Sequence, residues 1–273
     1  MSKEAITTVF DHAGALLIGS RSFAREVEEN HGTPLDRFTI VPGAVDATRF
    51  VPRDGLKLGE LCDPNALVLL YHGRVDRRKG ALDLLDALLK LRENSSWHGV
   101  RVIYSGIGPD FDAVNQKIIE LNLSEVVDVL GYVEYADVPA IYQKVDIFLS
   151  PTYAEGFSNT ILEAMASGLP VVSCEAVGVV DCLTDNVNGL LVQPGDIAAL
   201  AGAIERILED DDLRARLTEA AYKDAHELYS WPVVARQIMD VTDEIAGTQP
   251  DIDWQLSEPI DLSCRFREAP HLL

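Results

Sequence analysis

Between residues 67 and 192, short apolar runs alternate with segments of helical periodicity. The apolar runs, rich in Val, Ile, Leu and aromatic residues, are 67–71, 100–104, 126–130, 146–149 and 169–173. Their length and composition are typical of buried strands. The helical segments between them are 80–91, 111–121, 138–144 and 158–167. Strands that alternate with helices of this length form βαβ units, so we expect a Rossmann-like, doubly wound parallel α/β sheet with helices on both faces.

The region that follows is expected to be helical, because capping residues precede three segments rich in Ala, Leu, Ile and Val. The three helix starts are Asp196, either Asp211 or Asp212, and Ser230 with Trp231-Pro232 behind it. Proline fits the first turn of the third helix, where its missing N–H group has no intrahelical partner.

The sequence divides into four parts. In the first part, residues 1–52, we expect two strands and one helix, at 15–19, 38–41 and 20–29. These elements are too few for a two-layer core, so this part is interpreted as the end of a preceding domain. The remaining parts are a polar linker at 53–66, the main domain at 67–246 and a proline-containing extended tail at 247–273.

Charge limits the class of partner. The chain of 273 residues has a formal net charge of -21, which disfavours general attraction to nucleic acid or anionic lipid. An anionic ligand must therefore be held by locally placed cations and backbone N–H groups. The four cysteines are widely spaced, without metal-ligand spacing, and no metal site is expected. No apolar run approaches the ~20 residues of a membrane-spanning helix and no signal peptide is recognisable, so a cytoplasmic location is expected.

A basic loop, G-R-V-D-R-R-K-G at 73–80, connects the first predicted strand of the main domain to its helix. At the carboxyl end of a parallel strand, such a loop opens into the crevice where α/β sheets bind ligands. Arg74 can hold two phosphate oxygens, and Lys79 adds a compact positive charge one turn later. A solvated basic loop before an amphipathic helix is the alternative that this motif leaves open.

A second motif, E-G-F-S-N-T-I-L-E followed by A-M-A-S-G-L-P-V-V, begins at Glu155. The helix that starts within it leaves the N–H groups of Ser158, Asn159 and Thr160 available to an anion. Carboxylates accept hydrogen bonds from ring hydroxyls, so Glu155 and Glu163 suit a diphosphate with a sugar on one side and a ribose on the other. Alternatively, Glu155 is an N-cap partner and Glu163 an ordinary exposed helix residue.

Together with S-G-I-G-P at 105–109 and G-Y-V at 131–133, these motifs resemble the C-terminal domain of family 4 glycosyltransferases. The resemblance extends from about residue 15 to 245. It implies the C-terminal half of a GT-B fold with a truncated N-terminal domain. It also implies transfer of a sugar from a nucleotide-diphosphate sugar to an acceptor, with retention at the anomeric carbon.

The resemblance also assigns roles to residues. It implies that Arg74 and Lys79 bind the diphosphate and that Glu155 binds the hydroxyls of the transferred sugar, which makes these three the expected catalytic residues. Glu163 is expected to bind the ribose, and Val133 to lie near the nucleobase. The other expected donor-binding residues, most of them contributing backbone groups, are Gly73, Gly156, Phe157, Ser158, Asn159 and Thr160.

Neither a metal nor another cofactor is expected. The sequence has no Asp-x-Asp motif at a strand end, and Arg74 and Lys79 beside a helix N-terminus can stabilise the departing diphosphate. A nicotinamide cofactor is not expected, because Gly106 and Gly108 lack the third glycine of the dinucleotide fingerprint. Among the histidines only His72 precedes a predicted loop of the site; it either faces that site or is a satisfied strand residue.

The family's acceptor-binding N-terminal domain is not matched, which leaves two hypotheses. In the first, the chain is the donor-binding part of a glycosyltransferase and needs a protein partner that supplies the acceptor half. Its acceptor would then be an unknown glycan or lipid-linked molecule. In the second, the chain is a nucleotide-sugar-binding module without catalysis. A partner is expected to cover the apolar surface of the first fifty residues.

Overall fold

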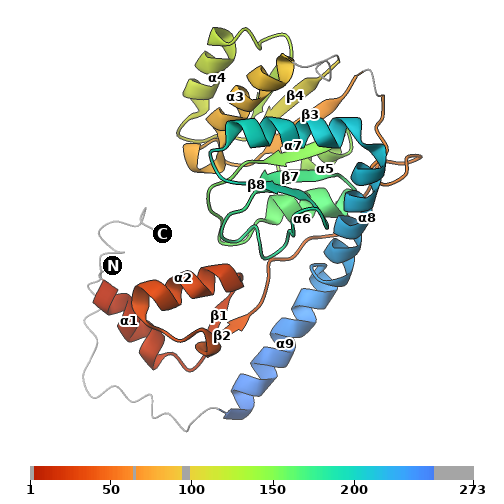
Figure 1. Cartoon of the computed structure of the whole chain (residues 1–273). Coiled ribbons are helices and arrows are strands. Elements are labelled where there is room, and N and C mark those ends of the chain that lie inside the picture. The colour runs from red at the N-terminus through yellow and green to blue at the C-terminus, as the bar shows by residue number, and fades with distance from the viewer. Residues whose placement is uncertain (1–2, 64–65, 94–98, 249–273) are drawn as a thin grey trace.

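The computed structural model describes residues 3–63, 66–93 and 99–248. They form a larger α/β unit and a smaller N-terminal unit, with a long C-terminal helix that extends from the larger one (Figure 1). Among the described residues, no helix is both long enough and apolar enough to cross a membrane.

The larger unit is built on a six-stranded sheet with the strand order β5-β4-β3-β6-β7-β8. Every neighbouring pair in it is parallel. The strands are β3 (Val68–His72), β4 (Arg101–Ser105), β5 (Val127–Gly131), β6 (Ile147–Ser150), β7 (Val171–Cys174) and β8 (Leu190–Val192). The expected parallel α/β sheet is confirmed, and the five predicted strands agree with the structure within two residues. Strand β8 was not predicted.

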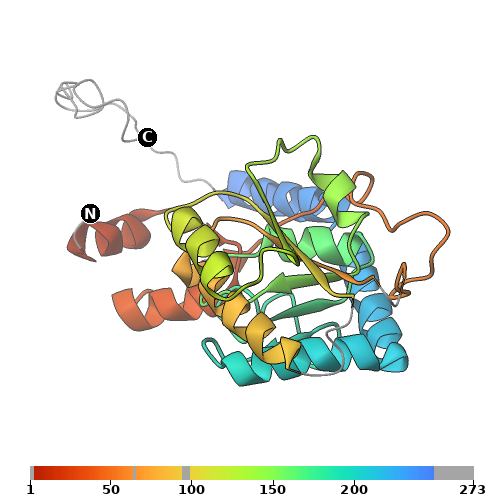
Figure 2. The ribbon, with the colours of Figure 1, turned by 90° about the horizontal axis from the view of Figure 1, so that it is seen from above.

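Helices cover both faces of this sheet (Figure 2). The first face carries α3 (Ala81–Arg92), α4 (Phe111–Glu120) and α7 (Ile197–Glu209), and the other carries α5 (Val138–Tyr142) and α6 (Asn159–Ala166). Helix α8 (Asp211–Glu227) contributes to both cores, with Leu217 in the first and Ala221 in the second. Leucine periodicity explains the packing of α3, since Leu84, Leu88 and Leu91 are fully buried on one stripe.

All three expected helix starts agree with the structure in position. Asp196 caps α7 by accepting a hydrogen bond from the N–H of Ala199 at 2.9 Å. Helix α8 begins at Asp211, but its cap is the preceding Asp210. The third helix, α9 (Trp231–Thr248), begins after Ser230 as expected.

The contact made by the Ser230 side chain was not predicted from the sequence. Its hydroxyl donates to the carbonyl of His226, at 2.8 Å, and so bonds back to the preceding helix. Helix α9 also continues to Thr248, into the beginning of the predicted tail. The remainder of that tail lies outside the described residues.

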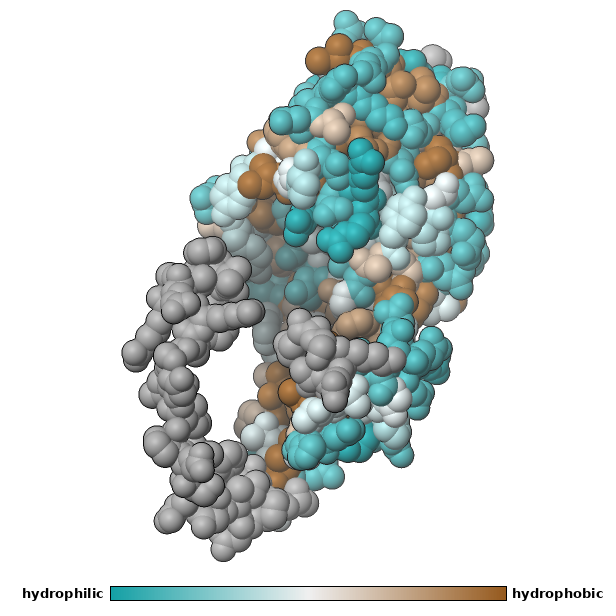
Figure 3. All heavy atoms as spheres, turned by 90° about the vertical axis from the view of Figure 1, so that its left-hand side faces the viewer, coloured by the Kyte–Doolittle hydropathy of each residue, from teal (hydrophilic) through white to brown (hydrophobic). Residues whose placement is uncertain are grey.

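The N-terminal unit contains α1 (Lys3–His12), β1 (Leu16–Ile18), α2 (Arg21–His31), the short 3-10 helix η1 (Leu35–Arg37) and β2 (Phe38–Ile40). Strands β1 and β2 pair in parallel. The two strands and α2 follow the sequence prediction, whereas α1 was not predicted. Val9, Leu17 and Phe23 are exposed, so hydrophobic residues lie at the surface of this unit (Figure 3).

The predicted linker packs against the larger unit. Arg214, a buried residue of α8, donates a hydrogen bond from Nε to the carbonyl of Gly59 at 2.8 Å. Gly59 has a φ of +73°, and a Cβ atom there would lie 2.9 Å from Cα of Ala215. Absence of a side chain at Gly59 therefore lets this segment lie directly on α8.

Gly80, at the end of the loop after β3, lies directly against the backbone of the loop that follows β6. Its φ is +67°, and a Cβ atom would lie 2.0 Å from the carbonyl oxygen of Pro151. We expect Gly80→Ala to destabilise the chain by more than about 1 kcal/mol, because both the backbone conformation and the space exclude a side chain.

Urea denaturation of the variant and the native chain checks this prediction. Gly202→Ala is the matched control, since Gly202 lies inside α7 with no atom within 4 Å of an added Cβ. Alanine there is expected to leave stability unchanged or to raise it by up to about 1 kcal/mol. Equal stabilities for the two variants would contradict the proposed role of Gly80.

Candidate functional site

The sheet has one point at which its strand order reverses. Strand β3 comes first in the chain, its neighbours β4 and β5 extend the sheet on one side, and β6 to β8 extend it on the other. In open α/β sheets, ligands bind outside the carboxyl ends of the strands at such a switch point. The two predicted motifs lie here, because residues 73–80 follow β3 and the motif that begins at Glu155 follows β6.

A cavity of about 230 Å³ lies between these two motifs. Eight predicted site residues line it, and they are Gly73, Arg74, Lys79, Glu155, Phe157, Ser158, Asn159 and Thr160. The other lining residues are Tyr71, His72, Leu149 and Ser150. Three predicted site residues, Val133, Gly156 and Glu163, are outside this lining. The sequence prediction thus identified most of the cavity lining, with His72 left open, but not Tyr71, Leu149 and Ser150.

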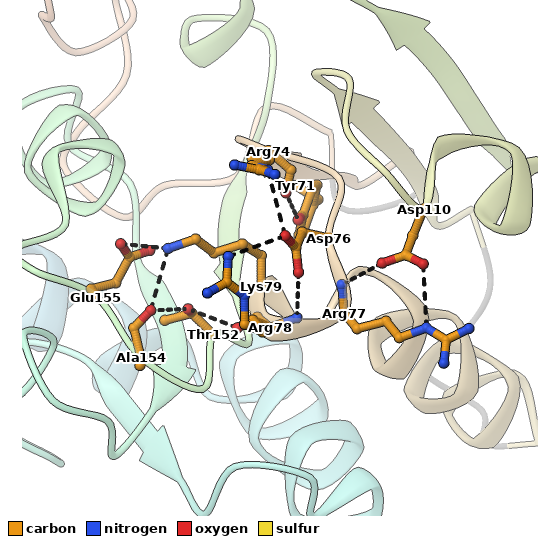
Figure 4. A network of polar contacts seen from close by, with 10 residues as sticks. All are labelled: Tyr71, Arg74, Asp76, Arg77, Arg78, Lys79, Asp110, Thr152, Ala154 and Glu155. Atoms are coloured by element: carbon orange, nitrogen blue, oxygen red, sulfur yellow. Dashed lines mark hydrogen bonds and ion pairs between the residues drawn. The ribbon is translucent and has the colours of Figure 1, made fainter. Parts of the chain in front are cut away.

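The loop after β3 presents its four basic side chains in different directions (Figure 4). The short 3-10 helix η2 (Arg77–Lys79) orders this loop, since the Asp76 side chain accepts from the N–H of Arg78 at 2.8 Å. That backbone hydrogen bond is the main cause that lowers the pKa of Asp76. Arg77 is held away from the cavity by Asp110, whose carboxylate accepts from Nε at 3.2 Å and from the backbone N–H at 2.8 Å.

Arg74 and Lys79 are the two basic residues of this loop that line the cavity. The side chain of Arg74 is 58% exposed and forms a long ion pair, 3.5 Å from Nε to Oδ2 of Asp76. A weak surface pair of this kind leaves the guanidinium free to reorient toward a ligand.

Lys79 forms an ion pair with Glu155 across the cavity, with 2.6 Å between Nζ and Oε2 (Figure 4). The same ammonium donates to the carbonyl of Ala154 at 3.3 Å. Glu155 is in turn held by its backbone N–H, which donates to the carbonyl of Val177 at 2.9 Å. The carboxylate of Glu155 thus contacts the lysine of the other motif.

The first turn of α6 faces the cavity. The helix begins at Asn159, and Ser158 precedes it without capping it through its side chain. Within the part of the chain that the structure describes, no hydrogen-bond acceptor is assigned to the N–H groups of Ser158, Asn159 and Thr160. Free amides at the positive end of a helix form a site that favours an anion.

Glu163 is buried behind this first turn, with 8% of its surface exposed. The hydroxyl of Tyr142 donates to its Oε2 at 3.0 Å and also lies 3.2 Å from the carbonyl of Thr160. Burial raises the pKa of Glu163 to about 7, because desolvation outweighs the favourable effects of Tyr142 and Arg49. The alternative of an ordinary exposed helix residue is therefore wrong, and Glu163 is connected to the cavity through Tyr142 and Thr160.

Val133 and Gly156 are not among the residues that line the cavity. Val133 follows β5 and packs against the core that contains Phe50 and Tyr142, on the α5 and α6 side of the sheet. Gly156 separates two lining residues, Glu155 and Phe157, without lining the cavity itself.

His72 fits both alternatives that the sequence left open. It lies at the end of β3 and lines the cavity, and its Nδ1 is 3.0 Å from the hydroxyl oxygen of Ser105. Its ring also meets that of Tyr142 edge to face, with 5.8 Å between the centroids. Burial lowers the pKa of His72 to about 4, so the imidazole is neutral near pH 7.

No group of three or more His, Cys, Asp or Glu side chains able to hold a metal ion occurs in residues 3–63, 66–93 and 99–248. The free thiols among these residues are Cys62, Cys174 and Cys182. Cys264 lies outside the described residues.

Comparison with curated proteins gives relatives considerably longer than the matched region. An uncharacterized glycosyltransferase of Methanocaldococcus jannaschii is 26% identical over 228 residues, which cover 81% of this chain and 58% of that protein. The D-inositol 3-phosphate glycosyltransferase of Corynebacterium aurimucosum is 29% identical over 242 residues, covering 85% and 57%. The chain thus spans somewhat more than half the length of these relatives.

Solved structures share the fold. Anabaena HepE, crystallised with UDP and glucose, superposes with a TM-score of 0.77 at 22% identity, covering 89% of this chain and 67% of HepE. Sucrose-phosphate synthase from Thermosynechococcus elongatus gives a TM-score of 0.79 at 22% identity, covering 90% and 62%. The sequence profile described as "Glycosyl transferases group 1" matches residues 60–224, which is more than half of the chain. The α/β unit shares its Rossmann-like fold with these GT-B neighbours, and the chain belongs to the group 1 glycosyltransferases.

Proposed function

We propose that this chain binds a nucleotide-diphosphate sugar in the cavity between the loops after β3 and β6, as the donor-binding part of a glycosyltransferase. The observation that carries the proposal is the convergence of Arg74, Lys79, Glu155 and the free end of α6 on one cavity at the switch point of the sheet. The crystal structures of HepE with UDP and with UDP-glucose support this choice of ligand.

Each group has a chemical role in this proposal. The diphosphate would lie against the α6 amides and receive charge-assisted hydrogen bonds from Arg74 and Lys79. Glu155 would accept hydrogen bonds from hydroxyls of the transferred sugar, and Glu163 would do so from the ribose. As the glycosidic bond breaks, the same cations and amides would stabilise the charge of the departing diphosphate. Metal-independent transfer with retention at the anomeric carbon, which the resemblance to family 4 implies, belongs to this proposal as well.

The proposal also concerns the part of the enzyme that binds the acceptor. We infer that a protein segment equivalent to the remaining part of the longer relatives binds the acceptor, a glycan or a lipid-linked molecule. The exposed Val9, Leu17 and Phe23 of the N-terminal unit support such a partner, since exposed apolar groups often mark interaction surfaces. Turnover of a simple acceptor by the chain alone would contradict the need for a partner.

A thermal-shift panel of UDP-, GDP- and ADP-sugars tests the binding proposal. The true donor, at about 100 times its dissociation constant, is expected to add roughly 2.7 kcal/mol of stability. Inorganic pyrophosphate at the same concentration is the control for a general anion effect. If no sugar nucleotide raises the unfolding temperature beyond that control, the proposed function is wrong.

A further inference from the structure

The N-terminal unit is fastened to the larger unit by the carboxylate of Asp181. Its Oδ1 accepts from the backbone N–H of Arg21 at 2.8 Å and of Ser22 at 3.2 Å, in the first turn of α2. Its Oδ2 accepts from the hydroxyl of Ser20 at 2.7 Å and also from the hydroxyl of Ser22. Burial opposes ionisation, but these hydrogen bonds outweigh it and lower the pKa of Asp181, so a carboxylate makes the contact near pH 7.

The same contact reaches the backbone that holds Glu155. The N–H of Gly178 donates to the hydroxyl of Ser22 at 2.9 Å, while the carbonyl of the adjacent Val177 accepts from the N–H of Glu155 at 2.9 Å. A Cβ atom on Gly178 would lie 2.3 Å from the carbonyl oxygen of Glu155, so this backbone touches the cavity loop directly. One short peptide segment therefore separates Ser22 from Glu155.

A second line of contacts joins the N-terminal unit to Phe157. A Cβ atom on Gly43 would lie 2.7 Å from Cδ1 of Phe157, and one on Gly19 would lie 3.6 Å from its Cβ. The ring of Tyr229 lies 5.8 Å from that of Phe157, and its hydroxyl donates to the backbone carbonyl of Asp181 at 3.0 Å. The carboxylate of Asp181 is thus linked through Ser22 to the loop of Glu155, and its backbone carbonyl is linked through Tyr229 to Phe157.

We propose that Asp181 is a positioning residue of the donor site, which clamps the first turn of α2 onto the segment around Gly178 and thereby fixes Glu155 and Phe157 in the cavity. This inference rests on the proposed function for its ligand. In this arrangement the N-terminal unit supports the sugar side of the cavity, in addition to any contribution to acceptor binding.

A cap for α2 alone does not account for these contacts. The hydroxyl of Ser20 already accepts from the N–H of Phe23 at 2.9 Å, which is the usual side-chain cap. The carboxylate comes from a residue 159 to 161 positions away in sequence and binds four further donor groups. Its contacts connect two units, and they end beside the carboxylate expected to bind the sugar.

The test compares Asp181→Asn with the native chain by hydrogen exchange and by ligand affinity. Asparagine keeps the shape of the side chain but loses one acceptor and the charge. We expect the amide of Glu155 to exchange about tenfold faster, because its loop loses support. The affinity for UDP-glucose is expected to fall about tenfold, and that for UDP much less, since Arg74 and the α6 amides hold the phosphates.

Asp185→Asn is the matched control. Asp185 accepts from the N–H of Leu191 at 2.9 Å, within the same part of the chain, and among the described residues it has no hydrogen bond to α2 or to the loop of Glu155. This variant is expected to leave both the exchange of Glu155 and the ratio of the two affinities unchanged. Ser22→Ala, which removes the hydroxyl between Asp181 and Gly178, is expected to reproduce the effect of Asp181→Asn.

A double-mutant cycle with Glu155→Gln completes the test. If Asp181 acts through Glu155, the two substitutions together weaken UDP-glucose binding less than the product of their separate effects. Unchanged exchange at Glu155 in Asp181→Asn, or additive effects on affinity, would overturn the inference. Should the native chain bind no sugar nucleotide, the proposed function fails, and the exchange experiment still decides whether Asp181 orders the loop.

Discussion

Replacing Glu163 with glutamine is expected to stabilise the ligand-free chain at pH 8 by up to about 3 kcal/mol. Burial raises the pKa of this carboxyl group from 4.5 to about 7, and each pKa unit corresponds to about 1.4 kcal/mol. The hydroxyl of Tyr142 can donate to the amide oxygen of the introduced glutamine as it does to the carboxylate, so the hydrogen bond is kept. The substitution therefore removes the free-energy cost of the buried charge and keeps the hydrogen bond.

The sign of the pH dependence follows from the raised pKa. Folding favours the protonated carboxyl, so its stabilising contribution is full below pH 4.5 and is lost as the pH rises through about 7. The stability difference between Glu163→Gln and the native chain should therefore grow between pH 5 and pH 8. Urea denaturation at both pH values measures it, and an equal difference at both would contradict the assigned pKa.

The same substitution is expected to weaken binding of the proposed donor. Ribose hydroxyls would donate to the ionised form of Glu163, so binding should release a proton and should be tighter at pH 8 than at pH 6. His72, with its pKa lowered to about 4, stays neutral over this range. Calorimetric titration in buffers of different ionisation enthalpy measures the released proton, and Glu163→Gln should abolish that release.

Removing the guanidinium of Arg74 is expected to raise the dissociation constant for the sugar nucleotide roughly tenfold to a hundredfold. A hydrogen bond to a charged group contributes about 1.5–3 kcal/mol, and Arg74 is the cavity arginine of its loop. Its long ion pair with Asp76 contributes little to the fold, so Arg74→Ala should unfold at the same temperature as the native chain.

Arg77→Ala provides a matched control from the same loop. Arg77 has the same side chain three positions later, but Asp110 holds it outside the cavity. We expect this variant to bind the sugar nucleotide with unchanged affinity. Equal losses in the two variants would indicate a general effect of positive charge and would contradict the specific role of Arg74.

The sheet could be predicted because its signal is local. Each of the five predicted strands is an apolar run between helical segments, and the βαβ rule then determines that they are parallel. Strand β8, Leu190–Val192, was not predicted, although it is no shorter than the predicted β1 and β2. Helix α1 was also missed, although Ile6, Val9 and Phe10 follow the spacing of one helix face.

The members of the site could be predicted, but several of their contacts could not. The pairing of Lys79 with Glu155 depends on β3 and β6 being neighbours, which the motifs alone do not specify. The burial of Glu163 depends on Tyr142, which comes from a different helix, α5. In the same way, Asp181 showed no signal in its own segment, because its partners are in α2.

The ion pair between Lys79 and Glu155 has a consequence for which molecules the cavity accepts. A compound that carries phosphates alone would draw the ammonium of Lys79 away and leave the partly buried carboxylate of Glu155 without a counter-ion. A free sugar would engage the carboxylate and leave the ammonium without one. Either separation is costly, whereas an intact donor satisfies both charges at once. In the proposed reaction, the lysine and the glutamate could pair again as the sugar departs, which would favour release of the spent nucleotide.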